Sequence, residues 1–204
     1  MDVEFIGQSV QLVGSYGGDE TIESAARTCT QTTTVREKVS SFVRKLIKRG
    51  HMSPLEFGFA DTLIECDRGI QQELTRHREF SYNIESTRLV DYLKKPLRYV
   101  TKPPKGMDVP PMCVECLEEY CALGARLYES WRNAGVTRDY LRKYFTLALA
   151  SRMRMAGNLR MWFEMLPKRT SKAAHPEVRE IALGLRHALS SVSKTLFGDG
   201  EEAE

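Results

Sequence analysis

The sequence predicts an α+β fold in which a central, mostly antiparallel sheet is flanked by helices within one domain. Short apolar segments bounded by glycine, at Val3–Ile6 and Val10–Val13, predict strands. Segments with apolar residues three and four positions apart, as over 39–47, predict amphipathic helices. At 204 residues the chain is long enough for one well-buried core, and nothing requires a second domain.

The N-terminal part then alternates predicted helices with turns. A helix is expected over Glu20–Thr28. Thr34 and Glu37 form a capping box, in which two side chains satisfy free amides at the start of a helix. The helix that they open is expected to end at Gly50. Its apolar positions include Val39, Phe42, Val43 and Ile47.

The segment after Gly50 has two interpretations. Ser53 followed by Pro54 is typical of a helix start, with the serine as N-cap and the proline as the first helical residue. The free amides of such a terminus bind anions. The alternative is an ordinary turn that leads into a strand predicted over Phe57–Cys66.

The middle of the chain contains a proline-rich loop and a long helix. Four prolines between Tyr99 and Met112 predict a surface loop, and the helix is expected over Met112–Trp131. Cys113 and Cys116 have the spacing of a zinc pair, but zinc needs four ligands and two more are not apparent nearby. We therefore favour a core-facing stripe on this helix. Its members are Cys113, Cys116, Tyr120, Leu123, Leu127 and Trp131.

After this helix the pattern predicts a short helix and a strand. Thr137 is expected to cap a helix that runs through Arg142. Residues 151–156 alternate polar and apolar, which predicts a strand with Arg152 and Arg154 on one face.

Two helices and a tail complete the chain. One helix is expected to begin at Asn158 and run to Arg169, and Pro176 opens the last long helix. Residues 1–197 are predicted to form the folded domain, and 198–204 an acidic, disordered tail. The buried candidates on the last helix are Val178, Ile181, Leu183 and Leu185.

Composition restricts the function classes. No apolar segment approaches the roughly 20 residues that span a bilayer, and the N-terminus lacks the pattern of a signal peptide, so we expect a cytoplasmic protein without a membrane partner. The net charge of +3 gives no overall case for nucleic acid, and the basic residues from Arg36 to Arg49 are interpreted as the wet face of a helix. Five cysteines, an odd number, argue against a disulfide framework.

The most informative segment is the fourteen-residue window from Thr75 to Arg88. It contains three arginines, a histidine, an asparagine and two serines, together with Phe80 and Tyr82. Arginine forks bind phosphates and carboxylates, and aromatic rings offer faces to flat heterocycles. A helix over 69–75 would leave Arg76 and Arg78 in or just past its last turn, pointing roughly 200° apart. The alternative is that these cations only complement the helix dipole.

The run Arg76-His77-Arg78, followed after seven residues by Ser86, resembles the signature of the flavin-dependent thymidylate synthases, the ThyX family. The segment from Gly50 to Glu56 resembles a G-H-x-S-P-x-E motif that the family carries about 25 residues upstream of the R-H-R run. The C-terminal third of the chain also resembles the ThyX family. Its matching residues are Arg142, Asn158, Arg160 and Arg169, and the likeness covers roughly 40–100 and 135–190.

The resemblance implies the activity and the partners. It implies a ThyX-like fold, a homotetramer with active sites shared between subunits, and transfer of a methyl group to carbon 5 of a uracil nucleotide, dUMP or UMP. The cofactor is FAD, with NADPH and methylenetetrahydrofolate as co-substrates. Neither a metal nor a nucleic acid is expected.

The resemblance also assigns roles to residues. The implied catalytic residues are His77, Ser86 and Arg169. The implied cofactor-binding residues are His51, Ser53, Arg76, His77, Arg78, Asn158 and Arg160. The implied substrate-binding residues are Arg76, Glu85, Ser86, Arg88, Arg142 and Arg169.

Several positions depart from the family pattern. Glu73 replaces a usual glutamine, Ile84 a usual glutamate, Glu164 a usual histidine or asparagine, and Cys29 a small hydroxyl residue. These changes motivate the hypothesis that the nucleotide preference has moved toward UMP. They also leave open a catalytically altered relative that binds flavin or nucleotide without turnover. A third alternative is a nucleic-acid-binding module built on the basic window, which would be colourless.

Overall fold

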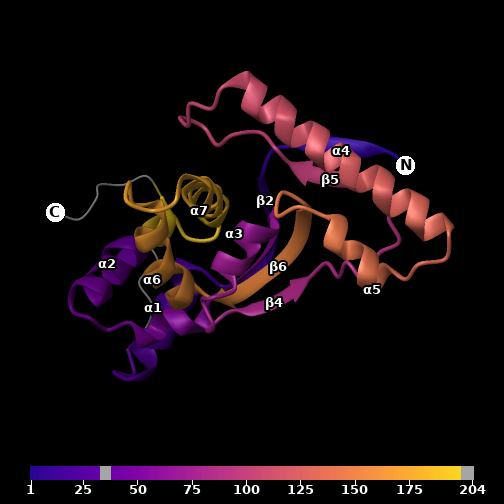
Figure 1. Cartoon of the computed structure of the whole chain (residues 1–204). Coiled ribbons are helices and arrows are strands. Elements are labelled where there is room, and N and C mark those ends of the chain that lie inside the picture. The colour runs from indigo at the N-terminus through magenta and orange to yellow at the C-terminus, as the bar shows by residue number, and fades with distance from the viewer. Residues whose placement is uncertain (33–37, 199–204) are drawn as a thin grey trace.

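Four strands form an antiparallel sheet through the middle of the molecule, in the order β2-β3-β6-β4 (Figure 1). This computed structural model describes residues 1–32 and 38–198. The strands are β2 (Ser9–Tyr16), β3 (Phe59–Asp67), β4 (Ser81–Ile84) and β6 (Ala150–Asn158). The predicted α+β class with a mostly antiparallel sheet is confirmed.

The two central strands, β3 and β6, alternate between residues that face the core and residues that face the opposite side of the sheet. β3 and β6 pair over nine residues, from Phe59 opposite Asn158 to Asp67 opposite Ala150. Met153 and Met155 of β6 are fully buried, whereas Arg152 and Arg154 are exposed on the opposite face. Because successive side chains of a strand point to opposite faces, this confirms the predicted strand with its arginines on one side.

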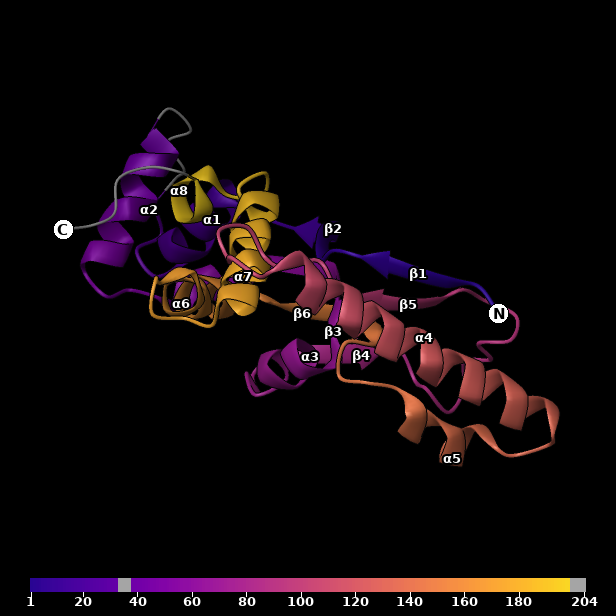
Figure 2. The same ribbon diagram turned by 45° about the horizontal axis from the view of Figure 1, so that its top comes forward.

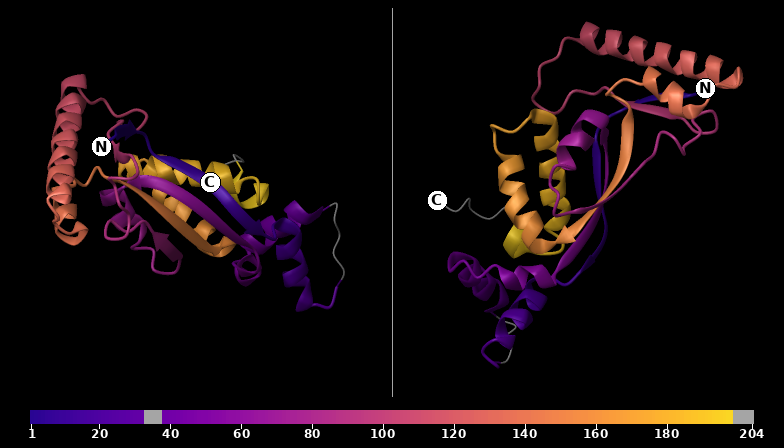
Figure 3. Two further views of the ribbon diagram at one scale, coloured as in Figure 1. Left: turned by 90° about the vertical axis from the view of Figure 1, so that its right-hand side faces the viewer. Right: turned by 60° about the horizontal axis from the view of Figure 1, so that its bottom comes forward.

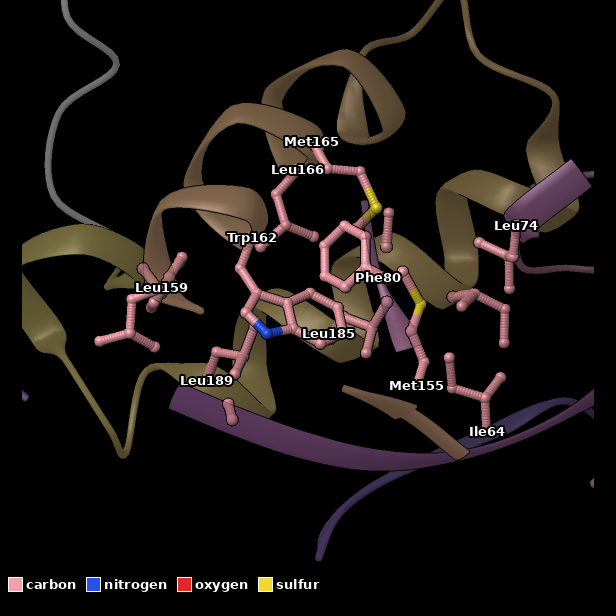
Figure 4. Close-up of a cluster of buried hydrophobic side chains, with 14 of the residues drawn as sticks. Ile64, Leu74, Phe80, Met155, Leu159, Trp162, Met165, Leu166, Leu185 and Leu189 are labelled. Atoms are coloured by element: carbon pink, nitrogen blue, oxygen red, sulfur yellow. The ribbon is translucent and has the colours of Figure 1, made fainter. Parts of the chain in front are cut away.

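Helices cover the buried face of the sheet and one of its ends (Figure 3). Those on the face are α3 (Arg68–Leu74), α6 (Leu159–Thr170) and α7 (Pro176–Leu189). Those at the end are α1 (Asp19–Thr28), α2 (Val39–Lys48), the 3-10 helix η2 (Ser53–Phe57) and α8 (Lys194–Phe197). The large core lies between these helices and the sheet, around Trp162, whose ring centre lies 4.5 Å from that of Phe80 (Figure 4).

A second, smaller layer lies at the opposite end of the molecule from α2 (Figure 2). Its strands β1 (Val3–Ile6) and β5 (Leu97–Val100) form a two-stranded parallel sheet. Its helices are α4 (Pro111–Asn133), α5 (Arg138–Leu141) and the 3-10 helix η3 (Arg142–Tyr144). A cluster that includes Tyr99 and Tyr128 forms the core of this layer.

The predicted stripe on α4 is wrong. Cys113, Cys116, Tyr120, Leu123 and Trp131 are exposed, Tyr120 at 63% and Trp131 at 48%. The buried face is instead formed by smaller residues and one tyrosine, which allow α4 to approach η3 closely. A Cβ atom on Gly124, for example, would lie only 2.5 Å from the carbonyl oxygen of Tyr144. The fully or nearly buried residues of α4 are Cys121, Gly124, Ala125 and Tyr128.

Other boundaries need correction. Ser53 lies in η2, but Met52 is the N-cap residue and no side chain caps this 3-10 helix. Thr137 precedes α5 without a side-chain cap. The predicted loop from Tyr99 to Met112 is shorter at both ends, because Tyr99 pairs in β5 and α4 begins at Pro111.

The C-terminal helices agree well with the sequence. The Asn158 side chain accepts a hydrogen bond from the Met161 amide at 3.0 Å, as expected of the residue that begins α6. On α7 the predicted buried residues are confirmed except Leu183, which is 44% exposed. The capping box at 34–37 and the tail beyond Gly198 lie outside the described residues. In the described part of the chain, no helix is both long and apolar enough to cross a membrane.

Candidate functional site

The residues of the R-H-R run leave helix α3 at its C-terminal end. The His77 amide donates to the Leu74 carbonyl at 3.1 Å, which continues the helical turn for one more step. Arg76 and Arg78 are exposed, whereas the side chain of His77 between them is only 15% exposed. Neither arginine forms an ion pair with another described residue. Both guanidinium groups are therefore available to an anionic ligand.

His77 is joined to the end of α6 by Arg169. The Arg169 Nε donates to His77 Nε2 at 3.0 Å, and its Nη1 lies 3.6 Å from the Glu73 carboxylate. A histidine nitrogen that accepts carries no proton, so His77 is the Nδ1-protonated tautomer in this arrangement. The fold thus brings the Arg169 guanidinium to the His77 imidazole, 92 residues away in the chain, and to the Glu73 carboxylate, 96 residues away.

Electrostatics favour the neutral form of His77. Burial lowers the pKa of His77, and the positive charge of Arg169 lowers it further, while Glu79 acts in the opposite direction. A neutral imidazole accepts the Arg169 hydrogen bond, which an imidazolium could not do. Burial and the neighbouring arginine therefore stabilise the same state of the pair.

A second group of candidate residues lies where η2 meets the start of α6. The Arg160 Nη1 contacts Glu56 at 2.7 Å, and its Nε contacts Glu164 at 2.7 Å. Glu164 is one of the positions that depart from the family pattern, and here it helps to neutralise Arg160. His51 and Ser53 are exposed beside this ion-pair cluster in the chain, without a side-chain partner among the described residues.

A third group lies in the loop after β4 and on α5. The Arg88 Nε lies 2.5 Å from Asp139, and Arg138 donates to the carbonyl of Leu89 at 2.8 Å. These contacts join the loop to the segment that ends in Arg142, whose side chain is exposed. The Ser86 hydroxyl oxygen accepts from the Arg88 amide at 3.3 Å, so the two residues lie side by side.

Glu85, next to this third group in the chain, lines a cavity of about 280 Å³. Tyr92 donates a hydrogen bond to Glu85 at 2.8 Å, and Arg98, also at the cavity, is held by Glu65. Arg152 lines the same cavity from the open face of the sheet. Ile84, in contrast, packs against the large core, so its side chain cannot replace the glutamate that the family usually carries there.

The structure thus brings some of the predicted site residues together and leaves others apart. His77 and Arg169 meet directly, and Ser86 lies beside Arg88. Within the described residues, no hydrogen bond or ion pair joins the third group, on the α5 side, to the first two. Sequence reasoning missed Asp139 and Tyr92, which hold Arg88 and Glu85; only the acidic first turn after Thr137 could have indicated Asp139.

The described residues offer no metal site and no activated thiol. No group of three or more His, Cys, Asp or Glu side chains in the described ranges is arranged to hold a metal ion. Burial raises the pKa of the Cys66 thiol to about 12, so Cys66 is not a thiolate at neutral pH. The exposed cysteines Cys29, Cys113 and Cys116 belong to none of the three groups.

Comparison with known proteins identifies relatives across most of the chain. A family model described as thymidylate synthase complementing protein (Thy1) matches residues 11–193. A flavin-dependent thymidylate synthase of Mycobacteroides abscessus is 29% identical over 205 residues, which cover 90% of this chain and 80% of the relative. One from Pyrobaculum aerophilum is 34% identical over 146 residues, which cover 71% of this chain and about half, 53%, of that relative.

A solved structure shares the fold. The crystal structure of the UMP/dUMP methylase PolB from Streptomyces cacaoi, bound with 5-Br UMP, superimposes with a TM-score of 0.78 at 20% identity. The match covers 96% of this chain and 94% of that chain. Because the identity is low, we take this likeness as a statement about the fold.

Proposed function

The chain belongs to the thymidylate synthase complementing family, and from that premise we propose that it is a flavin-dependent methyltransferase acting on carbon 5 of a uracil nucleotide. The observation that carries the proposal is the family match over 11–193 together with an R-H-R run whose two arginines are exposed and free of carboxylates among the described residues. The proposed cofactor is FAD. Methylenetetrahydrofolate donates the carbon unit and NADPH the reducing equivalents.

The residues present fit a flavin dinucleotide. Its pyrophosphate requires cationic donors, and Arg76 and Arg78 offer two guanidinium groups that no described carboxylate engages. His51 and Ser53 add exposed polar groups at η2. The Asn158 oxygen caps α6, while its amide nitrogen has no hydrogen-bond partner among the described residues. When bound, the flavin supplies the redox chemistry that converts the transferred carbon unit into a methyl group.

The protein's part in the reaction is to bind and polarise the nucleotide. In the proposed mechanism Arg169 donates hydrogen bonds to the uracil ring and stabilises the negative charge that develops as carbon 5 becomes nucleophilic. Glu73 and His77 fix the orientation of that guanidinium. No buried cysteine is ionised to attack the ring, because burial raises the pKa of both Cys66 and Cys121.

We propose that the active site is completed between subunits of a homotetramer. The residues proposed for the nucleotide phosphate, Ser86, Arg88 and Arg142, form their own group beside α5 rather than joining His77 and Arg169. Leu89 next to them is 79% exposed, and α4 exposes a row of large apolar side chains. Exposed apolar surface of this kind is typical of subunit interfaces. A neighbouring subunit would unite the two halves of the site.

We further propose that UMP is accepted as well as dUMP, and that the enzyme works in the cytoplasm. Glu73, one of the divergent positions, lies 3.6 Å from Arg169, so the divergence touches the nucleotide side of the site. All the cysteines are free, which fits a reducing compartment.

The test is the absorbance spectrum of the purified protein, followed by tritium release from carbon-5-labelled dUMP and UMP. We expect a yellow protein that releases tritium from both nucleotides. A yellow protein without release would favour the catalytically altered relative. A colourless protein whose oligonucleotide binding weakens steeply with salt would favour the nucleic-acid module. Release from dUMP alone would remove the UMP proposal and leave the enzyme class intact.

A further inference from the structure

Helix α2 and the turn after it form a strongly positively charged stretch of the chain. Residues 38–55 contain five lysines or arginines and no aspartate or glutamate. The whole chain has a net charge of only +3, so this stretch carries more than the entire excess. The five cations are Lys38, Arg44, Lys45, Lys48 and Arg49. We call them the α2 cation row.

The α2 cation row lies on the face of the helix that points away from the core. Val39 and Val43 are buried on the opposite face, whereas all five cations are exposed. None of the five forms an ion pair within residues 1–32 and 38–198. Elsewhere, arginines such as Arg154 and Arg160 have carboxylate partners. The row is therefore a concentration of positive charge that the described fold does not neutralise.

The row ends at the candidate flavin site. Arg49 is the C-cap residue of α2, Gly50 turns the chain with φ of +73°, and His51 follows with its amide bonded to the Leu46 carbonyl. Lys48 and Arg49 thus lie next to the proposed flavin residues His51 and Ser53. Favourable interaction with the helix dipole accounts for cations in the last turn only. It does not account for Lys38 and Arg44 on the same exposed side.

The arrangement of the α2 cation row indicates which kind of anion it can bind. A phosphate group is held where several donors converge, but side chains on the outer face of a helix diverge. Arg44, Lys45, Lys48 and Arg49 are related by i,i+3 and i,i+4 spacings, which place side chains about 5–6 Å apart, and Lys38 lies one to two turns before them. Such a series fits a flexible chain of repeated negative charges. Among the proposed substrates, only a folate with a γ-linked polyglutamate tail offers such a chain. Its pterin would lie at the flavin and its tail would extend outward.

We propose that the α2 cation row binds the polyglutamate tail of the folate co-substrate, an inference that rests on the proposed function. The tail contacts are ion pairs at the surface, so each is weak and salt-sensitive, and affinity increases with the number of glutamates. The row thereby selects polyglutamylated folate over the monoglutamate without contact with the reacting atoms.

The test compares pteroylmonoglutamate with pteroylpentaglutamate by isothermal titration calorimetry on the flavin-loaded protein. For the unchanged protein we expect the pentaglutamate to bind about tenfold more tightly at low salt, with the advantage lost at high salt. In K45Q/K48Q the advantage should decrease to about threefold or less, while monoglutamate affinity stays the same. The matched control K94Q/R126Q removes two exposed cations elsewhere and should keep the full advantage.

The outcomes separate this inference from the proposed function. If the monoglutamate binds and the pentaglutamate binds no better, the tail site is wrong and the enzyme assignment stands. An equal loss of advantage in K45Q/K48Q and in the control would also overturn the inference, because general charge would explain it. If neither folate binds while tritium release still occurs, the folate part of the proposed function fails as well. Tighter binding of oligouridylate than of pentaglutamate, lost in K45Q/K48Q, would assign the row to nucleic acid instead.

Discussion

The two cores of this protein differ in composition, and the two halves of the proposed site differ accordingly. The large core between the sheet and helices α6 and α7 is mostly aliphatic, with Trp162 at its centre. The small core under α4 has eight buried residues, of which three are tyrosines. The R-H-R run and Arg169 lie on elements of the large core, whereas Arg142 lies on the outer layer beside α4 and α5.

The half of the proposed site that lies on the large core is expected to be the more rigid one. A polarising arginine must keep its position to a fraction of an ångström, and Arg169 extends from a helix whose inner face is completely buried. A phosphate clamp tolerates more movement, because charge acts over a longer range. The outer layer exposes apolar side chains such as Leu89 and Trp131, which subunit contacts would cover in the proposed tetramer.

The largest effect is expected in the large core. Trp162 is fully buried, contacts Phe80 and donates its indole N–H to the Gly157 carbonyl at 3.1 Å. We expect W162A to lower the free energy of unfolding by about 3–5 kcal/mol, measured by urea denaturation. Because Phe80 follows the R-H-R run, flavin content should decrease too. W162F should lose less, and equal losses in both variants would show that packing around the ring is not the cause.

Removal of Arg169, the proposed polarising group, should abolish most of the activity while leaving the fold intact. We expect R169A to reduce kcat by about 100-fold or more, since electrostatic stabilisation of the developing charge is lost. R169K should recover little, because lysine lacks the planar fork whose separate nitrogens contact His77 and Glu73. Lys172, exposed in the turn after α6, provides the matched control K172A, which should keep full activity in the tritium-release assay. Equal activity of R169A and K172A would exclude the proposed role.

The sequence predicted the elements of the large core better than those of the outer layer. Strand β6 and helices α6 and α7 have strong periodic patterns and recognisable starts at Asn158 and Pro176. Strand β5 lies next to the prolines of the loop, and β4 is hidden in a window rich in charged residues. Their pairing depends on partners far away in the chain, which local patterns do not encode.

The prediction of the buried face of α4 was wrong for a related reason. Large apolar residues at helical spacing predicted the buried face, but the close approach of η3 leaves room only for small residues such as Gly124 and Ala125. In the candidate site, the motif predicted which residues gather at the end of α3. It could not predict that Glu73 and Arg169 meet, because 96 residues separate them.

A moderate gain in stability is expected from the outer core. The Tyr99 hydroxyl is buried without a hydrogen-bond partner among the described residues, which costs free energy that a phenylalanine would not. We expect Y99F to raise the free energy of unfolding by about 1 kcal/mol and the Tm by about 2–4 °C. Y92F is the matched control, because its hydroxyl bonds to Glu85 and its removal should destabilise. A decrease in Tm of Y99F would indicate that this hydroxyl is satisfied in the assembled protein.

A smaller effect concerns the pH dependence of the large-core half. Since burial and Arg169 lower the pKa of His77 below its ordinary value of 6.5, the unfolded chain binds the proton more tightly than the folded one. The stability that His77 contributes is therefore complete above pH 6.5 and is lost as the pH falls toward the lowered pKa. Thermal unfolding between pH 7.5 and 5 should show a steeper loss in the unchanged protein than in H77Q. If stability fell equally with pH in both proteins, the lowered pKa of His77 would be contradicted.

The smallest effect on stability, and the sharpest contrast between the halves, is expected at Asp139. Its ion pair with Arg88 joins side chains that are 59% and 64% exposed, so D139N should change the free energy of unfolding by less than about 0.5 kcal/mol. In the proposed site, however, Arg88 must exchange this carboxylate for the nucleotide phosphate. The KM for dUMP or UMP should therefore decrease in D139N while kcat stays the same, whereas R88A should raise KM. An unchanged KM in both variants would place the phosphate elsewhere, and the outer layer would then have no share in nucleotide binding.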